Sequence, residues 1–413
     1  MTIVLFLAFS CTSVTAQTVS QHSFKFKGFS IIINDDAFDE NNNHLLVGEI
    51  RAIETEEHKR DPNINKIFDL KGYCNDDGMG IIITTNKDYK TLQIARSFIG
   101  KKVVYERNKK QFTIGANFFD YLKVANDSFS AWQPIIIQMD LKLKGATYWV
   151  QKPYSCILTN MVVENNEIII FTRSRFERRG FNEKAEVIRV TTSKYHIDNE
   201  KSWIQVLEPL ASLETPYNDV GRITLSDVSK VDNAYYFTTS NLDQFSLKNI
   251  NHLYQLKDTK LEEVLYFSDY LEWNTEGSSD WININEFIVN ATKNYLFLTH
   301  KGASNKEMVF SKTDASFNKL LSQKIPVNDY ADFNKMLLLS NGDIVILMVN
   351  DKATWSFFLY NSAMKLIKEI ISTIPKEYYP NKLKAIENGY IECVFYIDNT
   401  NKKDCVLQTI NLN

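Results

Sequence analysis

Short apolar runs separated by polar turns are the dominant pattern along this chain. Five stretches share one form, in which an apolar run, a polar pair and a second apolar run follow each other. The polar pairs are Asn165-Asn166, Asp232-Asn233, Lys293-Asn294, Asn341-Gly342 and Asn388-Gly389. Asn, Asp and Gly tolerate the positive φ that tight hairpin turns require, so the pattern predicts a series of β-hairpins.

The spacing of these pairs predicts a repeated unit. Successive pairs lie 67, 61, 48 and 47 residues apart, and the last two distances match the roughly 40–50 residues of a propeller blade. The longer distances allow a blade with a loop insertion. Further apolar pairs after several hairpins give each unit four strands, so we predict an all-β fold, a β-propeller of six or seven four-stranded blades. A β-sandwich is the alternative, but its strands would not repeat at a constant period.

Three observations complete the predicted architecture. Residues 362–374 have helical spacing, but their frequent β-branched residues fit the last strand of a blade equally well. Apolar stretches at 23–33 and 405–412 lie near the two ends of the chain, and we expect the first and last strands to pair in one blade. No linker or charge block divides residues 17–413, which we predict to be a single propeller domain.

Composition narrows the class of protein. The 413 residues are 44% hydrophobic and 13% aromatic, and the formal net charge is −3. A nucleic-acid-binding protein usually has a basic surface, and this charge balance argues against one. Neither a metal nor another cofactor is expected. The acidic run 34–44, which contains Asp35, Asp36, Asp39 and Glu40, lacks the glycine and terminal glutamate of an EF-hand loop.

The first residues predict export. Residues 3–9 are apolar but far fewer than the roughly 20 that span a membrane, and Val14 and Ala16 suit a signal-peptidase cleavage site before Gln17. Residues 1–16 are therefore predicted to be a signal peptide of a secreted bacterial protein. Alternatively, residues 7–11 resemble a lipoprotein signal that ends at residue 10, with lipidation at Cys11. Either alternative predicts a secreted, periplasmic or outer-surface location, with membrane contact only through a lipid anchor.

Two cysteines lie on either side of a predicted turn. Cys393 and Cys405 would face each other across a hairpin whose turn falls at residues 398–400. A cross-strand disulfide is one prediction in an oxidising compartment, and two reduced cysteines packed together are the other. The cysteines show no C-x-x-C spacing, so a zinc site is not expected.

The stretch HIDNEKSW, residues 196–203, resembles the Asp-box of sialidase-like propellers, approximately Ser-x-Asp-x-Gly-x-Thr-Trp. Asp198, Ser202 and Trp203 fit this pattern, whereas His196 and Glu200 depart from it. The resemblance implies a turn between the third and fourth strands of a blade, where the box has a structural role. A generic polar hairpin is the alternative.

Arginines offer one candidate ligand site. A sialidase-like active site would need three arginines to hold a carboxylate, together with a Tyr–Glu pair and an Asp acid. Arg173 and Arg175 follow an apolar strand, and with Arg222 they are candidates for binding an anion such as an acidic sugar. The alternative is a solvated loop with ion pairs.

Aromatic residues offer another candidate site. Tyr270, Trp273 and Trp281 lie in a long insertion with acidic and amide residues, and aromatic faces stack on sugar rings. We therefore predict a monomeric ligand- or partner-binding module for a carbohydrate, a cell-envelope component or a protein. A glycoside hydrolase or lyase of sialidase-like architecture is the alternative.

Overall fold

The computed structural model is built almost entirely from β-strands. It describes residues 18–53, 60–62, 64, 66, 79–124, 127–150, 155–164, 167–174, 183–190, 195–198, 201–204, 210–215, 224–225, 228–242, 249–258, 260–266, 282–301, 307–326, 334–350, 353–386, 389–397 and 404–412. No helix in these ranges is both long and apolar enough to cross a membrane.

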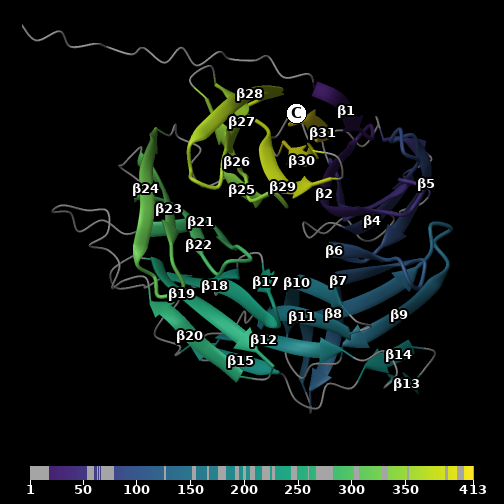
Figure 1. Ribbon diagram of the computed structural model, residues 1–413. Helices are drawn as coiled ribbons and strands as arrows, with labels where there is room; N and C mark the ends of the chain where they lie inside the picture. The colour runs from purple at the N-terminus through teal and green to yellow at the C-terminus, as the bar shows by residue number, and fades with distance from the viewer. Residues whose placement is uncertain are drawn as a thin grey trace, which may run out of the picture. The chain divides into compact units, whose positions relative to one another are not determined.

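The described strands form seven sheets (Figure 1), and four of these sheets contain only strands that are consecutive in the sequence. The first contains β2 (Phe29–Phe38), β3 (His44–Ala52), β4 (Met79–Thr85) and β5 (Thr91–Ser97). The second contains β6 (Ile99–Glu106), β7 (Gln111–Val124), β8 (Asp127–Met139) and β9 (Gly145–Val150), extended by β14 (Lys201–Ile204) and β13 (Tyr195–Asp198). The third contains β10 (Cys156–Glu164), β11 (Glu167–Ser174), β12 (Glu183–Val190) and β15 (Ala211–Thr215).

The later sheets repeat this order. The fourth contains β16 (Thr224–Leu225) and β17 (Ser229–Val231), which both pair with β18 (Ala234–Leu242), then β19 (Asn249–Lys257) and β20 (Lys260–Tyr266). The fifth contains β21 (Ile282–Val289), β22 (Tyr295–Lys301), β23 (Glu307–Thr313) and β24 (Lys319–Pro326). The sixth contains β25 (Lys335–Leu338), β26 (Ile344–Val349), β27 (Thr354–Tyr360) and β28 (Leu366–Pro375).

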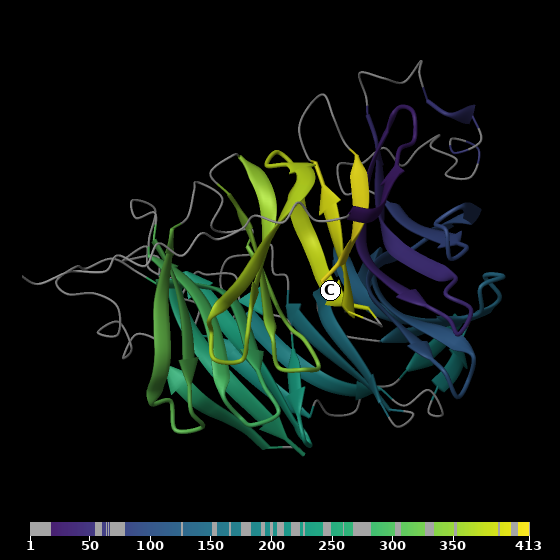
Figure 2. The ribbon, with the colours of Figure 1, turned by 45° about the horizontal axis from the view of Figure 1, so that its top comes forward.

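The seventh sheet uses both ends of the chain. Its order is β29 (Tyr379–Ala385), β30 (Tyr390–Tyr396), β31 (Cys405–Asn411) and then β1 (Thr18–Phe24). The purple first strand lies beside the yellow last strands in Figure 2. The seven four-stranded units confirm the predicted β-propeller class, with seven blades, and confirm that the first and last strands pair. Residues 366–375 form a strand, not a helix.

Contacts divide the chain into two compact units. One contains residues 1–21, 284–393 and 407–413, and the other contains residues 22–283 and 394–406. In the second unit, the first two sheets pack through a shared apolar cluster that includes Leu45, Val47, Phe112, Ile114 and Ile135. In the first unit, the fifth and sixth sheets share a similar cluster. Central strands such as β26 are buried at every position, which explains why they appear in the sequence as unbroken apolar runs.

Seven turns in the described part of the chain share an arrangement that is more specific than the predicted one. In the turn between β27 and β28, the Asn361 side chain accepts hydrogen bonds from the backbone N–H groups of Ala363 (3.0 Å) and Lys365 (2.9 Å). Met364 then has a positive φ of 62°. The same arrangement, an Asp or Asn followed three residues later by a left-handed residue, begins at Asp39, Asn86, Asp140, Asn290, Asp314, Asn350 and Asn361.

This arrangement corrects part of the turn prediction. Positive φ occurs at Asp232, Lys293, Gly342 and Gly389, as expected. However, the turn at Lys293 spans five residues from Asn290 rather than the predicted pair, because Asn290 Oδ1 accepts the N–H of Asn294 at 2.8 Å. Asn165, Asn166 and Asn388 lie outside the described residues.

The hairpin of residues 195–204 has the predicted strands in an unexpected setting. His196 pairs with Trp203, and Asp198 pairs with Lys201. In the sequence, the hairpin lies between β12 and β15, the third and fourth strands of their sheet. The Asp-box resemblance implied this position. However, β14 pairs in parallel with β9 of the preceding sheet. The segment is therefore an excursion that extends a neighbouring blade rather than a tight turn within its own blade.

Of the two alternatives for Cys393 and Cys405, the structure has the reduced cysteines. Cys393 on β30 and Cys405 on β31 are buried thiols, so the alternative disulfide is not formed in this structure. Burial raises the pKa of Cys405 to about 12, which keeps this thiol protonated and unreactive. Cys11, the predicted lipidation site, lies outside the described residues.

Candidate functional site

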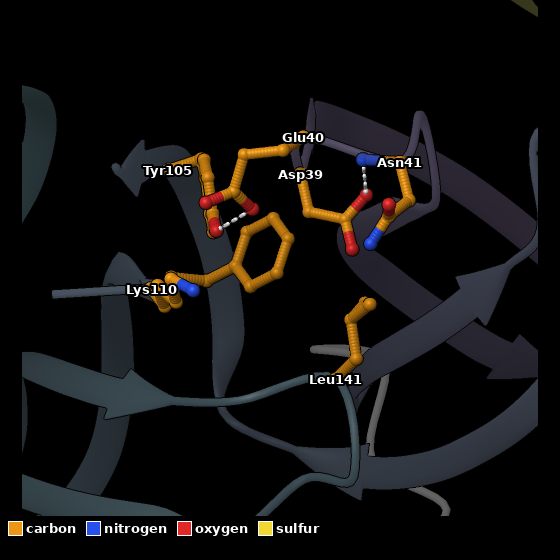
Figure 3. A pocket seen from close by; sticks show the side chains of 7 residues that line it. Asp39, Glu40, Asn41, Tyr105, Lys110 and Leu141 are labelled. Atoms are coloured by element: carbon orange, nitrogen blue, oxygen red, sulfur yellow. Dashed lines mark hydrogen bonds between the residues drawn. The ribbon is translucent and has the colours of Figure 1, made fainter. Parts of the chain in front are cut away.

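Three hairpin turns of the first two blades surround a pocket. Its volume is about 500 Å³, within the usual range for small-molecule sites. The turns are β2–β3, β6–β7 and β8–β9, all at the same end of their strands. The lining residues are Asp39, Glu40, Asn41, Tyr105, Lys110, Phe112 and Leu141 (Figure 3).

Glu40 and Tyr105 point toward each other at this pocket (Figure 3). The Tyr105 hydroxyl donates a hydrogen bond to Glu40 Oε2. This bond, with a further contribution from the positive charge of Lys110, lowers the pKa of Glu40 below its ordinary value. Desolvation and the same hydrogen bond raise the pKa of Tyr105 to about 12. At neutral pH the pair is therefore a carboxylate that accepts and a phenol that donates.

Asp39 has a different role although it is adjacent in the chain. Its Oδ1 accepts the backbone N–H groups of Asn41 and Asn43, both at 2.8 Å. Its Oδ2 accepts a hydrogen bond from the Asn43 side chain at 3.0 Å. The carboxylate is thus committed to the turn that presents Glu40 and Asn41, and it is not placed as a second reactive acid.

The remaining walls combine a cation with apolar groups. Lys110 takes a positive φ of 51° in the β6–β7 turn, which brings its side chain to the pocket opposite Glu40 (Figure 3). Phe112 is buried, and its ring lies 4.9 Å from that of Tyr105. Leu141 packs on the same apolar cluster. The pocket therefore offers a carboxylate, a phenol, an ammonium group and an amide beside an apolar wall.

The residues expected to bind ligand are only partly placed. Arg173 lies on β11, where it pairs in register with Ile157 and Ala185, and it does not line this pocket. Arg175, Arg222, Tyr270, Trp273 and Trp281 lie outside the described residues, so their roles stay predictions.

The sequence did not predict this pocket. The acidic run that contains Asp39 and Glu40 lacks the features of a calcium loop, and in the structure Asp39 holds a turn while Glu40 accepts a hydrogen bond from Tyr105. Tyr105 lies 65 residues after Glu40 in the sequence. No local pattern in the sequence indicates that the β6–β7 turn lies beside the β2–β3 turn.

Comparisons with known proteins agree with the fold. No protein-family model matches the sequence, and no curated protein matches it. Among solved structures, a protein of unknown function from Dyadobacter fermentans DSM 18053 is 9% identical, with a TM-score of 0.50 over 96% of this chain and 99% of that chain. The polysaccharide lyase Uly1 is 7% identical, with a TM-score of 0.53 over 92% of this chain and 90% of that chain. At these identities the similarities concern the fold alone.

Proposed function

We propose that this chain is a ligand-binding β-propeller whose pocket around Glu40 and Tyr105 receives a hydroxyl-rich ligand such as a sugar unit. The observation that supports this proposal best is the Glu40–Tyr105 pair at the pocket. A sugar ring offers hydroxyls to a carboxylate, an amide and an ammonium group, and it offers a C–H face to apolar side chains.

The protonation states favour binding over hydrolysis at this pocket. A glycosidase needs a carboxylic acid that stays protonated, with a second carboxylate nearby. The pKa of Glu40 is lowered, the opposite of what a general acid needs, and the neighbouring carboxylate of Asp39 is held by backbone N–H groups. A tyrosinate base is disfavoured in turn, since the pKa of Tyr105 is raised to about 12.

The setting of this function is part of the proposal. Export, expected from residues 1–16, would place the pocket where glycans or envelope proteins are available. One structure of similar fold is that of a polysaccharide lyase, and a carbohydrate ligand is compatible with it. Because only 7% of residues are identical, the choice of a carbohydrate rests on the pocket.

Titration calorimetry with neutral gluco-, xylo-, manno- and chito-oligosaccharides tests the proposal. We expect at least one to bind, and we expect Glu40→Gln to raise its Kd about tenfold, because the neutral amide is a weaker acceptor for a sugar hydroxyl than the carboxylate. Tyr105→Phe removes the hydroxyl and should weaken binding in the same direction.

Tyr148→Phe is the matched control. Tyr148 lies on β9 of the same sheet and does not line the pocket. The Kd of the Tyr148→Phe variant for the oligosaccharide should therefore stay within about twofold of the wild-type value. If no neutral oligosaccharide binds, or if Glu40→Gln binds as tightly as the wild type, the proposal is wrong.

A further inference from the structure

The inner strand of the second blade contains a β-bulge at Lys101. Gly100 pairs with Ala116, and the next paired residue, Lys102, faces Gly115. Lys101 is therefore the extra residue of β6. Bulges turn a side chain out of the regular alternation of a strand and recur beside functional sites.

Contacts with the first blade fix this bulge in place. The Asn34 side chain donates a hydrogen bond to the Gly100 carbonyl at 2.7 Å. A Cβ atom on Gly100 would lie 2.5 Å from the Cβ of Val47, so glycine is required for β6 to approach β3 this closely. The position of Lys101 is thus set by backbone packing rather than by a loose loop.

Two arginines occupy equivalent positions on the blades at either side. Arg51 pairs with Ser30, the second residue of β2. Arg173 pairs with Ile157, the second residue of β10. Because β6 packs against β3 on one side and against β10 on the other, Lys101 lies between the two blades that carry these arginines, at the same end of their strands.

Lys101 interacts electrostatically with both arginines. Burial lowers the pKa of Lys101 below its ordinary value, and the charges of Arg51 and Arg173 lower it further, whereas Glu49 raises it. Glu49 Oε1 also lies 3.1 Å from Arg51 Nη2. Both arginines therefore disfavour the charged form of Lys101, and an anion bound beside it would favour that form.

We propose that Lys101, Arg51 and Arg173 form a binding site for the oxyanion group of an acidic ligand, a carboxylate or a sulfate on a polysaccharide. Guanidinium groups bind both groups through paired hydrogen bonds. This site lies at the opposite end of the strands from the Glu40–Tyr105 pocket, since β2 runs from Phe29 beside the arginine end to Phe38 beside the pocket. The oxyanion site does not depend on the proposed function, so either proposal can be wrong while the other is right.

Calorimetry with three pentasaccharide probes tests this site: oligogalacturonate, its methyl ester, and a sulfated neutral oligosaccharide of equal length. We expect an acidic probe to bind and the methyl ester to bind at least tenfold more weakly, because the ester removes the charge and keeps the sugar. The relative affinity of the uronate and the sulfate identifies which oxyanion the site accepts. Binding should also weaken at high salt.

Substitutions locate the site. Lys101→Met and Arg173→Gln should each raise the Kd for the acidic probe at least tenfold, while Lys101→Arg should stay within about threefold. Arg189→Gln is the matched control: Arg189 lies on β12 beside β11, is exposed and pairs with Glu167 at 3.2 Å. Far-ultraviolet circular dichroism and melting curves verify that each variant is folded.

Three outcomes would overturn the proposal. No acidic probe binds; the methyl ester binds as tightly as the acid; or Arg189→Gln weakens binding as much as Lys101→Met, which would indicate a general charge effect instead of a site. Misfolding of Lys101→Met leaves Arg173→Gln and Lys101→Arg to decide.

Discussion

Single residues in the left-handed conformation shape many of the described hairpins. Outside glycine, positive φ occurs at residues as different as Lys293, Phe317, Ala353 and Met364. A side chain in this conformation costs roughly 1–2 kcal/mol. Phe317 and Met364 are buried, so packing compensates there, but Ala353 is exposed and gains no such packing.

Ala353→Gly should therefore stabilise the protein. Removing the Cβ relieves the strain at φ 60°, while the added freedom of the unfolded chain costs roughly 0.4–1 kcal/mol, which leaves a net gain of up to about 1 kcal/mol. The midpoint of urea unfolding measures the effect. Ala363→Gly is the control, because Ala363 is exposed at a turn position without positive φ, and it should lose roughly 0.5–1 kcal/mol. Equal shifts in both variants would contradict the explanation.

At this scale the sequence predicted that turns exist more reliably than it predicted their geometry. Four of the predicted turn pairs contain a residue with positive φ, but in seven turns the decisive feature is an Asp or Asn three residues before the left-handed residue. At Asp314 the left-handed residue is Phe317, a residue type that carries no turn signal by itself. Its conformation follows from the Asp314 side chain, which holds the N–H of Ser316 at 2.8 Å.

Between elements, buried polar side chains connect one blade to the next. Asp35 Oδ2 accepts the N–H of Val103 at 3.0 Å and so joins β2 to β6. Asn117 makes the corresponding link from β7 to β10, since it accepts the N–H of Leu158 (2.7 Å) and donates to the Leu158 carbonyl (3.0 Å). Inner strands carry bulges at Asn34, Lys101 and Thr159, which free backbone groups for such links.

Asp35→Ala should destabilise the protein strongly. Asp35 is 1% exposed, and its carboxylate also accepts the N–H of Asp36 at 2.9 Å. The substitution leaves two buried donors without this acceptor, at a cost of roughly 2–4 kcal/mol. The control is Asp140→Ala. The backbone N–H groups of Lys142 and Lys144, which donate to Asp140, are exposed to water, so this variant should lose only about 1 kcal/mol of stability. Chemical unfolding measures the free energy of unfolding of both variants. If the two variants lose equal stability, burial does not explain the effect of Asp35→Ala.

These links also explain why the candidate sites were only partly predictable. Strand alternation and turn residues are local, so they indicated the blades. The partner of Glu40 is Tyr105, and the cations around Lys101 come from β3 and β11. These pairings depend on how neighbouring blades pack and on one-residue bulges, and neither property changes the apolar pattern of the strands.

For the molecule as a whole, the seventh sheet is assembled from the two ends of the chain. The strands β29, β30 and β31 come from the C-terminal end, and β1 from the N-terminal end covers the edge of β31. Six of the seven residues of β31 are buried. An uncovered strand of this kind would present unpaired backbone groups to other molecules.

Deleting residues 1–24 should therefore open this sheet, whereas deleting residues 1–17 should not. The longer deletion removes β1, including Phe24, whose 6% exposure corresponds to roughly 1.5–3 kcal/mol of burial. We expect a lower melting temperature, concentration-dependent association on size-exclusion chromatography, and faster amide exchange confined mainly to residues 405–411. Because the shorter deletion leaves β1 intact, it should melt and elute like the full chain. If the two truncated proteins behave alike, β1 does not contribute to closing the propeller, and the last blade is stable with three strands.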